Sequence, residues 1–110
     1  MNNIVILTKE SVPIGFRMEG HAGAFYDGRD LVCAALSVLS QNTVFSISKL
    51  SGLLKDRDFG FFEDASLPVY EMIIKKSNEK AELLMRSFEL GVKIMEESYP
   101  DNCKLTYKEV

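Results

Sequence analysis

The chain has little from which a metal site or a disulfide framework could be built: one histidine and two cysteines among 110 residues. A structural zinc site needs four ligands, usually from paired cysteine or histidine motifs. His21, Cys33 and the aspartates near them supply too few, so a metal site is the weakest of the functional interpretations considered below. Cys103 lies seventy positions from Cys33, and two such distant thiols do not indicate a stabilising disulfide. We therefore predict no metal site.

Basic residues are not in excess, since 13 Lys and Arg face 16 Asp and Glu and give a net charge of −3. The longest basic cluster is the pair Lys75 and Lys76. A nucleic-acid-binding domain usually carries a dense basic patch, so we predict no direct nucleic-acid binding. The first ten residues, MNNIVILTKE, lack the basic start and the long apolar run of a signal peptide or membrane span. We therefore expect a cytoplasmic protein without a membrane partner.

The length and the apolar content of 46% are those of one globular domain, residues 1–110, with one hydrophobic core. Alternating or β-branched apolar residues predict strands, and apolar residues at spacings of three and four predict helices. The predicted strands cover residues 3–8, 14–19, 59–63, 68–74 and 103–107, and the predicted helices cover 31 to about 54 and 77 or 78 to 99. The order ββαββαβ predicts an α+β fold, with a mostly antiparallel or mixed sheet covered by two helices.

Local signals mark the ends of these elements. Pro13, within KESVP, indicates the turn of the first hairpin, and Gly52 with the charged residues after it indicates the end of the first helix. Ser77 or Asn78 can cap the second helix, and Pro100 ends it. The segment TVFSIS (43–48) favours a strand by propensity, which weakens the second half of the first helix.

The segment EGHAGAFYDGRDLVCAALS (19–37) places His21 at the end of the second strand and Cys33 near the start of the first helix. If Asp30 caps this helix, Cys33 is its third residue; if Asp27 is the cap, Cys33 comes about a turn later. A helix N-terminus favours the thiolate form of a cysteine. A nearby histidine can accept the thiol proton, and amides at the helix start could receive an oxyanion. These residue types therefore suit nucleophilic attack on a carbonyl group.

Each of these residues also has a purely structural interpretation. Cysteines in helices are often buried and inert, and a His and a Cys twelve positions apart form a weak signal by spacing alone. Asp30 could orient His21 or only cap the helix. Ser37, one turn after Cys33, could hold the substrate or the imidazole, or bond back to a helix carbonyl. Cys103 is expected to pack in the core.

Three short motifs resemble the ribosomal-processing cysteine protease family, Prp. They are GHAG (20–23), GRDLVCAALS (28–37) and the ending YPD (99–101) before the last strand. The resemblance extends over nearly the whole chain, including its length and element order. One departure is the aromatic pair Phe25 and Tyr26, which could line a pocket for aromatic side chains or pack the loop down.

The resemblance implies a cysteine endopeptidase that removes the N-terminal extension of a large-subunit ribosomal protein, number twenty-seven, after a pair of aromatic residues, and so supports ribosome assembly. It implies His21 and Cys33 as a catalytic dyad, a homodimer, a mobile loop 22–29 over the site, and no metal or organic cofactor. The supporting or substrate-binding residues expected around the dyad are Gly20, Ala22, Asp30 and Ser37. The alternative is a non-catalytic, ribosome-associated binding module, which needs no reactive thiol.

Overall fold

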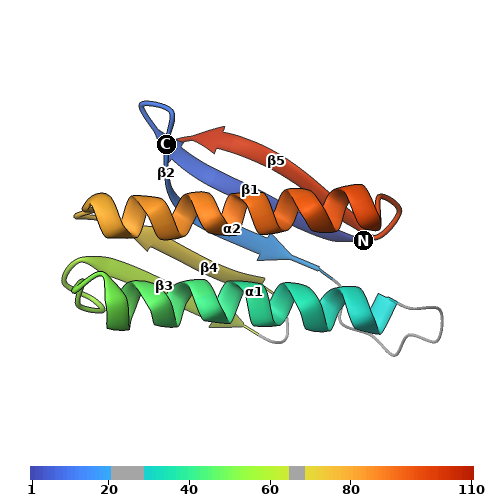
Figure 1. The fold of residues 1–110 in the computed structure, drawn as a ribbon, viewed down its shortest axis with the longest axis horizontal. Helices are drawn as coiled ribbons and strands as arrows, with labels where there is room; N and C mark the ends of the chain where they lie inside the picture. Colours follow the sequence, from blue (N-terminus) through green and yellow to red (C-terminus); the bar gives the residue numbers. More distant parts are fainter. Residues whose placement is uncertain (21–28, 65–68) are drawn as a thin grey trace.

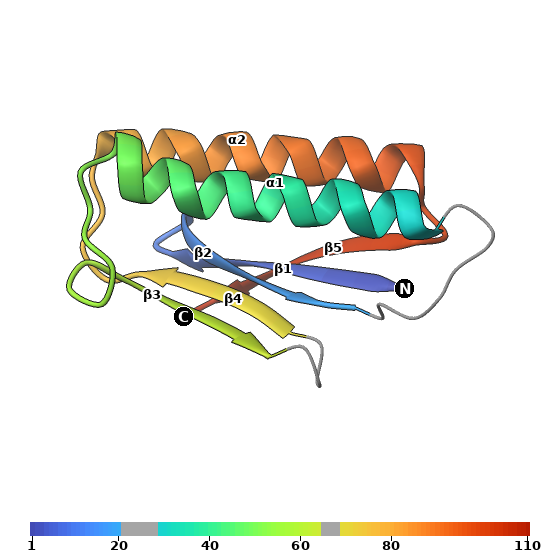
Figure 2. The same ribbon diagram turned by 90° about the horizontal axis from the view of Figure 1, so that it is seen from below.

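Five strands form one mixed sheet, and two helices lie side by side on one of its faces (Figures 1 and 2). The computed structural model describes residues 1–20, 29–64 and 69–110. The elements are β1 (Asn2–Lys9), β2 (Val12–Glu19), α1 (Arg29–Leu50), β3 (Phe59–Asp64), β4 (Val69–Ile74), α2 (Glu79–Ser98) and β5 (Cys103–Glu109). The predicted α+β class and the ββαββαβ order are confirmed.

β2 is the central strand, because the sheet order is β3-β4-β2-β1-β5. It pairs antiparallel with β1 and with β4, and its alternation places Phe16 in the core while Arg17 on the other face pairs with Glu71 at 2.7 Å. Pro13, predicted in the turn, instead lies inside β2 opposite Thr8, next to a shift in register. The strand tolerates it because pairing with β4 begins only at Gly15, so the missing N–H interrupts no hydrogen bond on that side.

β5 makes the sheet mixed by pairing parallel to β1, with Asn2 opposite Cys103. β3 and β4 form the predicted second hairpin, antiparallel from Phe59 opposite Ile74 to Asp64 opposite Val69. Pro68, which the sequence placed at the start of the fourth strand, lies outside the described residues.

α1 is a continuous helix that ends earlier than predicted, at Leu50 rather than near residue 54. Gly52 follows with a φ of +80°, a left-handed conformation that glycine adopts without steric cost and that commonly stops a helix. The TVFSIS segment is helical despite its propensity. Ile47 is buried in the core, and the Thr43 hydroxyl donates to the Leu39 carbonyl at 2.9 Å. Tertiary packing therefore outweighs local preference here.

Residues Leu31–Leu50 are long and apolar enough to cross a membrane by length and composition alone, and 28% of this stretch is buried inside the structure. A helix that lines a protein core passes the same test. Val32, Leu36 and Ile47 of α1 lie in the core, which accounts for part of its apolar character.

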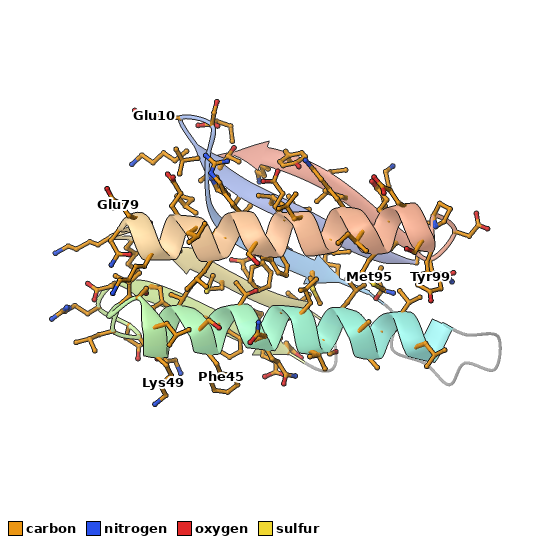
Figure 3. All side chains as sticks on the ribbon, in the orientation of Figure 1. Glu10, Phe45, Lys49, Glu79, Met95 and Tyr99 are labelled. Carbon is orange, nitrogen blue, oxygen red and sulfur yellow. The ribbon has the colours of Figure 1, made fainter. Side chains whose placement is uncertain are left out.

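α2 runs antiparallel to α1 along the same face of the sheet (Figures 1 and 2). Of the two predicted caps Asn78 is the one used: its side chain accepts from the N–H of Ala81 at 2.9 Å. The helix ends at Ser98, and the C-cap residue Tyr99 donates its N–H to the Met95 carbonyl at 2.8 Å (Figure 3).

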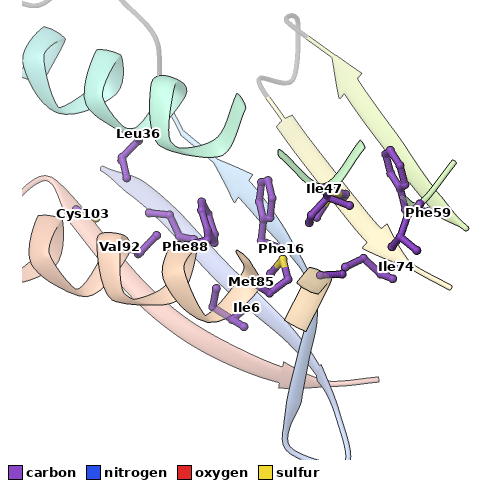
Figure 4. Packing of buried hydrophobic residues seen from close by; sticks show 14 of the residues in the cluster. Ile6, Phe16, Leu36, Ile47, Phe59, Ile74, Met85, Phe88, Val92 and Cys103 are labelled. Carbon is purple, nitrogen blue, oxygen red and sulfur yellow. The ribbon is translucent and has the colours of Figure 1, made fainter. Parts of the chain in front are cut away.

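One hydrophobic core fills the space between the helices and the sheet (Figure 4). Phe16 of β2 lies near its centre and packs against Phe88 of α2, with ring centroids 4.3 Å apart. The predicted stripe of α2 is confirmed, since four of its six members are buried and the other two are partly buried. The fully buried members are Ala81, Met85, Phe88 and Val92, and the partly buried ones are Leu84 and Met95.

Candidate active site

Cys33 lies in the second turn of α1, as the fifth residue of a helix that begins at Arg29. It is half-buried. The start of α1 lies at the same end of the molecule as the N-terminus (Figure 1). Asp30, one of the two proposed caps, is inside the first turn and not at the cap position, so that alternative was wrong. The second alternative was a cap at Asp27, which lies outside the described residues.

The side-chain amide of Asn2 faces the sulfur atom of Cys33. Asn2 Nδ2 lies 3.6 Å from Cys33 Sγ, and Asn2 Oδ1 lies 3.8 Å from it. A neutral thiol can donate to Oδ1, whereas a thiolate can only accept from Nδ2. The amide can therefore hydrogen-bond the sulfur in either protonation state.

The orientation of this amide is fixed by Asn102, in the turn between α2 and β5. Asn2 donates to the Asn102 carbonyl twice, from its backbone N–H at 2.9 Å and from Nδ2 at 3.2 Å. A carbonyl oxygen only accepts, so this contact places Nδ2, not Oδ1, on the side of Asn102. The Asn102 N–H in turn donates to the Tyr99 carbonyl at 3.0 Å, so the YPD motif (99–101) forms the turn that presents this carbonyl.

Gly20 lies against the other side of Asn2. A Cβ atom at this position would be 2.2 Å from Asn2 Oδ1 and 3.3 Å from Asn2 Cα, which is too close for any side chain without movement. The backbone at the end of β2 therefore approaches Asn2 as closely as a glycine allows. His21 is the next residue in the sequence.

Of the other predicted site residues, the structure describes some and leaves others outside the described ranges. His21, Ala22 and the loop 22–28 with Phe25 and Tyr26 lie outside the described residues, as does the side chain of Asp30. Ser37 is exposed, one turn after Cys33, and its carbonyl accepts from the Ser40 hydroxyl at 3.0 Å.

Asn2 and Asn102 were not predicted. Asn2 is separated from the apolar run IVIL (4–7) by Asn3, and the predicted strand began only at residue 3, so the prediction left Asn2 outside the sheet.

Cys103 provides an internal contrast to Cys33. Its side chain is buried in the core, as predicted, with 1% of its surface exposed. Burial, and then the negative charge of Glu96, raise the pKa of Cys103 to about 11. A thiol in this environment is protonated at neutral pH and inaccessible to reagents, so it is unsuited to nucleophilic chemistry.

No cluster of three or more His, Cys, Asp or Glu residues with metal-binding geometry occurs within residues 1–20, 29–64 and 69–110. The described part of the site consists of the Cys33 thiol, the Asn2 carboxamide and the backbone carbonyl of Asn102. This donor set suits the binding of carbonyl oxygens and thiolates.

The fold and sequence were compared with those of known proteins. A family model described as cysteine protease Prp matches residues 1–104. This chain belongs to that family, whose members are cysteine proteases and therefore hydrolyse peptide bonds. Its relatives include the ribosomal processing cysteine protease Prp of Staphylococcus aureus, 28% identical over 91 residues (83% of each chain), and that of Bacillus subtilis, 29% identical over 96 residues (84% of each chain).

Solved structures have the same fold. A crystal structure of a Streptococcus mutans protein superimposes with a TM-score of 0.86 at 27% identity, covering 100% of this chain and 96% of that one. The Prp protease of S. aureus in complex with a substrate peptide superimposes with a TM-score of 0.82 at 24% identity, covering 98% of this chain and all of that one. A second S. aureus Prp structure carries a covalently linked product peptide.

Proposed function

We propose that this chain is a cysteine endopeptidase in which Cys33 is the nucleophile and His21 the base. The observation that carries the proposal is the match to a cysteine protease family over residues 1–104, together with the place of Cys33 in the fold. Of the two cysteines in the chain, Cys103 is buried in the core with a raised pKa, which leaves Cys33 as the candidate nucleophile. His21 follows Gly20, whose backbone approaches Asn2, and Asn2 contacts the sulfur of Cys33.

The proposed reaction has two stages. In the first, the Cys33 thiol proton passes to His21, Sγ bonds to the carbonyl carbon, and the π electron pair moves to the oxygen. When this pair returns, the C–N bond breaks, the imidazolium protonates the departing amine, and a thioester remains. In the second stage His21 takes a proton from water, and the hydroxide displaces the sulfur from the acyl carbon. The new carboxyl terminus leaves, and the imidazolium returns its proton to the sulfur.

The proposed substrate is the precursor of large-subunit ribosomal protein number twenty-seven, cut after an aromatic pair near its N-terminus, a step that supports ribosome assembly. Two curated relatives are named for ribosomal processing, which supports this class of substrate. The exposed Ser37, one turn from Cys33, is available to bind a peptide lying along α1. Gly20, Ala22 and Asp30 are proposed as supporting residues, and the chemistry requires no metal or cofactor.

The test is mass spectrometry of the ribosomal precursor after incubation with the protein. We expect one cut, after the aromatic pair, with the wild-type chain, and none with Cys33→Ala or His21→Ala. Cys103→Ala, which removes only the buried thiol, is the matched control and retains the activity. Cleavage by Cys33→Ala at the wild-type rate would refute the assignment.

Alkylation separates a protease from a non-catalytic, ribosome-associated binding module. With iodoacetamide at pH 7, Cys33 is expected to react at least about tenfold faster than Cys103, because a buried thiol with a pKa of about 11 carries almost no thiolate. Peptide mapping of the modified chain measures both sites at once. Equally slow reaction at both cysteines would favour the binding module.

The proposal includes a homodimer in the cytoplasm, without nucleic-acid or membrane partners. Leu31, Val38 and Phe45 of α1 recur every seven residues and expose 69%, 68% and 62% of their surfaces. They form one apolar stripe, and Phe45 lies on the side of α1 away from α2 (Figure 3). Burying such a stripe favours association. Sedimentation should give twice the monomer mass for the wild-type chain, and Val38→Glu should lower it.

A further inference from the structure

The backbone N–H of Cys33 is used inside α1 and is not directed at a group bound to the sulfur. Cys33 is the fifth residue of α1, and the N–H of a fifth helical residue is bonded to the carbonyl four residues earlier, that of Arg29. The helix-start amides named in the sequence analysis do not therefore include the N–H of the nucleophile itself. A side chain from another element can supply a donor beside the sulfur, and Asn2 of β1 is in contact with it.

The Asn2 carboxamide is such a donor. Nδ2 carries two protons; one is directed to the Asn102 carbonyl at 3.2 Å and the other to Cys33 Sγ at 3.6 Å. The oxygen of a tetrahedral intermediate is two bonds from the attacking sulfur. With Nδ2 3.6 Å from the sulfur, an oxygen on the Asn2 side can lie within the roughly 2.7–3.1 Å over which an oxyanion donor acts.

The carboxamide is also held in place before the reaction. Its backbone N–H and its Nδ2 both bond to Asn102, and Gly20 packs against Oδ1 from the opposite side. Donors that need not reorient when charge develops give the largest stabilisation of the transition state. The neighbouring Asn3 lies on the opposite face of β1 and is exposed.

We propose that Asn2 is a catalytic residue whose Nδ2 group donates a hydrogen bond to the oxyanion formed when Cys33 attacks a peptide carbonyl. This inference rests on the proposed role of Cys33. As the S–C bond forms, negative charge leaves the sulfur and collects on the carbonyl oxygen. The proton on Nδ2 that pointed to Sγ then points to this oxygen. When the C–N bond breaks and the carbonyl re-forms, the hydrogen bond weakens again.

The test compares cleavage with alkylation in four proteins: wild type, Asn2→Ala, Asn2→Asp and the matched control Asn3→Ala. Alkylation by iodoacetamide uses the same sulfur but forms no oxyanion. We expect Asn2→Ala to lower kcat for an aromatic-pair peptide by about 10²–10³, the usual loss of one oxyanion donor. KM and the Cys33 alkylation rate should stay within about threefold of wild type. Asn3→Ala should match wild type in every assay.

The isosteric Asn2→Asp variant keeps the size of the side chain and removes the Nδ2 donor. It should lose at least as much kcat as Asn2→Ala, because a carboxylate repels the oxyanion. The melting temperatures of Asn2→Asp and wild type are measured together. If they agree, a loss of kcat in Asn2→Asp does not come from misfolding. Equal loss of cleavage and alkylation in Asn2→Ala, or wild-type kcat in both Asn2 variants, would overturn the inference. An inactive wild-type chain would instead overturn the proposed function, and this inference with it.

Discussion

Replacing Gly20 with alanine should impair the site while leaving the fold nearly intact. The new Cβ would stand 2.2 Å from Asn2 Oδ1, whereas ordinary contacts begin near 3.4 Å. Gly20 does not have a left-handed φ, so the backbone conformation itself tolerates alanine. The carboxamide of Asn2 therefore has to move away by about 1 Å. Its Nδ2 group, which faces Cys33 Sγ, moves with it.

The expected loss of activity follows from this displacement of the Asn2 carboxamide. A misplacement of about 1 Å in a catalytic group costs roughly 10²-fold in rate, so kcat/KM for peptide cleavage should fall by about that factor. The stability loss is limited to the side-chain hydrogen bond between Asn2 and Asn102, about 1 kcal/mol. Peptide cleavage and urea unfolding measure the two quantities separately.

Gly60→Ala is the control, because no heavy atom lies within 4 Å of a Cβ atom at Gly60. It should change neither the rate nor the stability by more than about 0.5 kcal/mol. Combining Gly20→Ala with Asn2→Ala should give no further loss of rate beyond Asn2→Ala alone, since the group that alanine displaces is already absent. Full activity in Gly20→Ala, or losses that multiply in the double variant, would refute the reasoning.

Two further predictions concern stability. Gly15→Ala would place Cβ 2.3 Å from the backbone oxygen of Met72 in β4; because backbone cannot move aside as a side chain can, the loss should reach about 3 kcal/mol in urea unfolding. A Gly15→Ala chain as stable as Gly60→Ala would contradict this. The pKa of about 11 at Cys103 lies above the unfolded value of about 8.5, so the unfolded chain loses this proton first as pH rises. The stability that the buried thiol contributes is complete below about pH 8.5 and is lost toward pH 11, by at most about 1.4 kcal/mol per pH unit. Between pH 7.5 and 10.5, the free energy of unfolding in urea should fall less steeply for Cys103→Ala than for wild type. Equal slopes for the two chains would exclude the effect.

The strands and helices were predictable because their apolar residues repeat with the right periods. The alternation around Phe16 and the stripe through Phe88 each placed a residue correctly in the core. The errors occurred where a local signal met tertiary packing. Pro13 suggested a turn but lies at the end of β2 that β4 does not reach, and the β-branched TVFSIS segment is helical because Ile47 is buried.

The candidate site was predictable only in part. Cys33 follows from its motif and its position near a helix start, and the close packing around Gly20 agrees with a glycine before His21. The role of Asn2 could not be predicted, because its contact with the sulfur depends on Asn102, about a hundred residues further along the chain. Parallel pairing of β1 with β5 creates this contact, and no local pattern encodes the pairing of strands so distant in sequence.

That pairing also decides when the site can form during synthesis. A ribosome makes Asn2 and Cys33 early, but the carbonyl that fixes Asn2 belongs to Asn102, just before β5. Until β5 has emerged and docked beside β1, a nascent chain holds the thiol without its fixed amide donor. Long-range pairing of this kind forms late in folding, so peptide-cleaving competence belongs to the finished chain and not to the growing one.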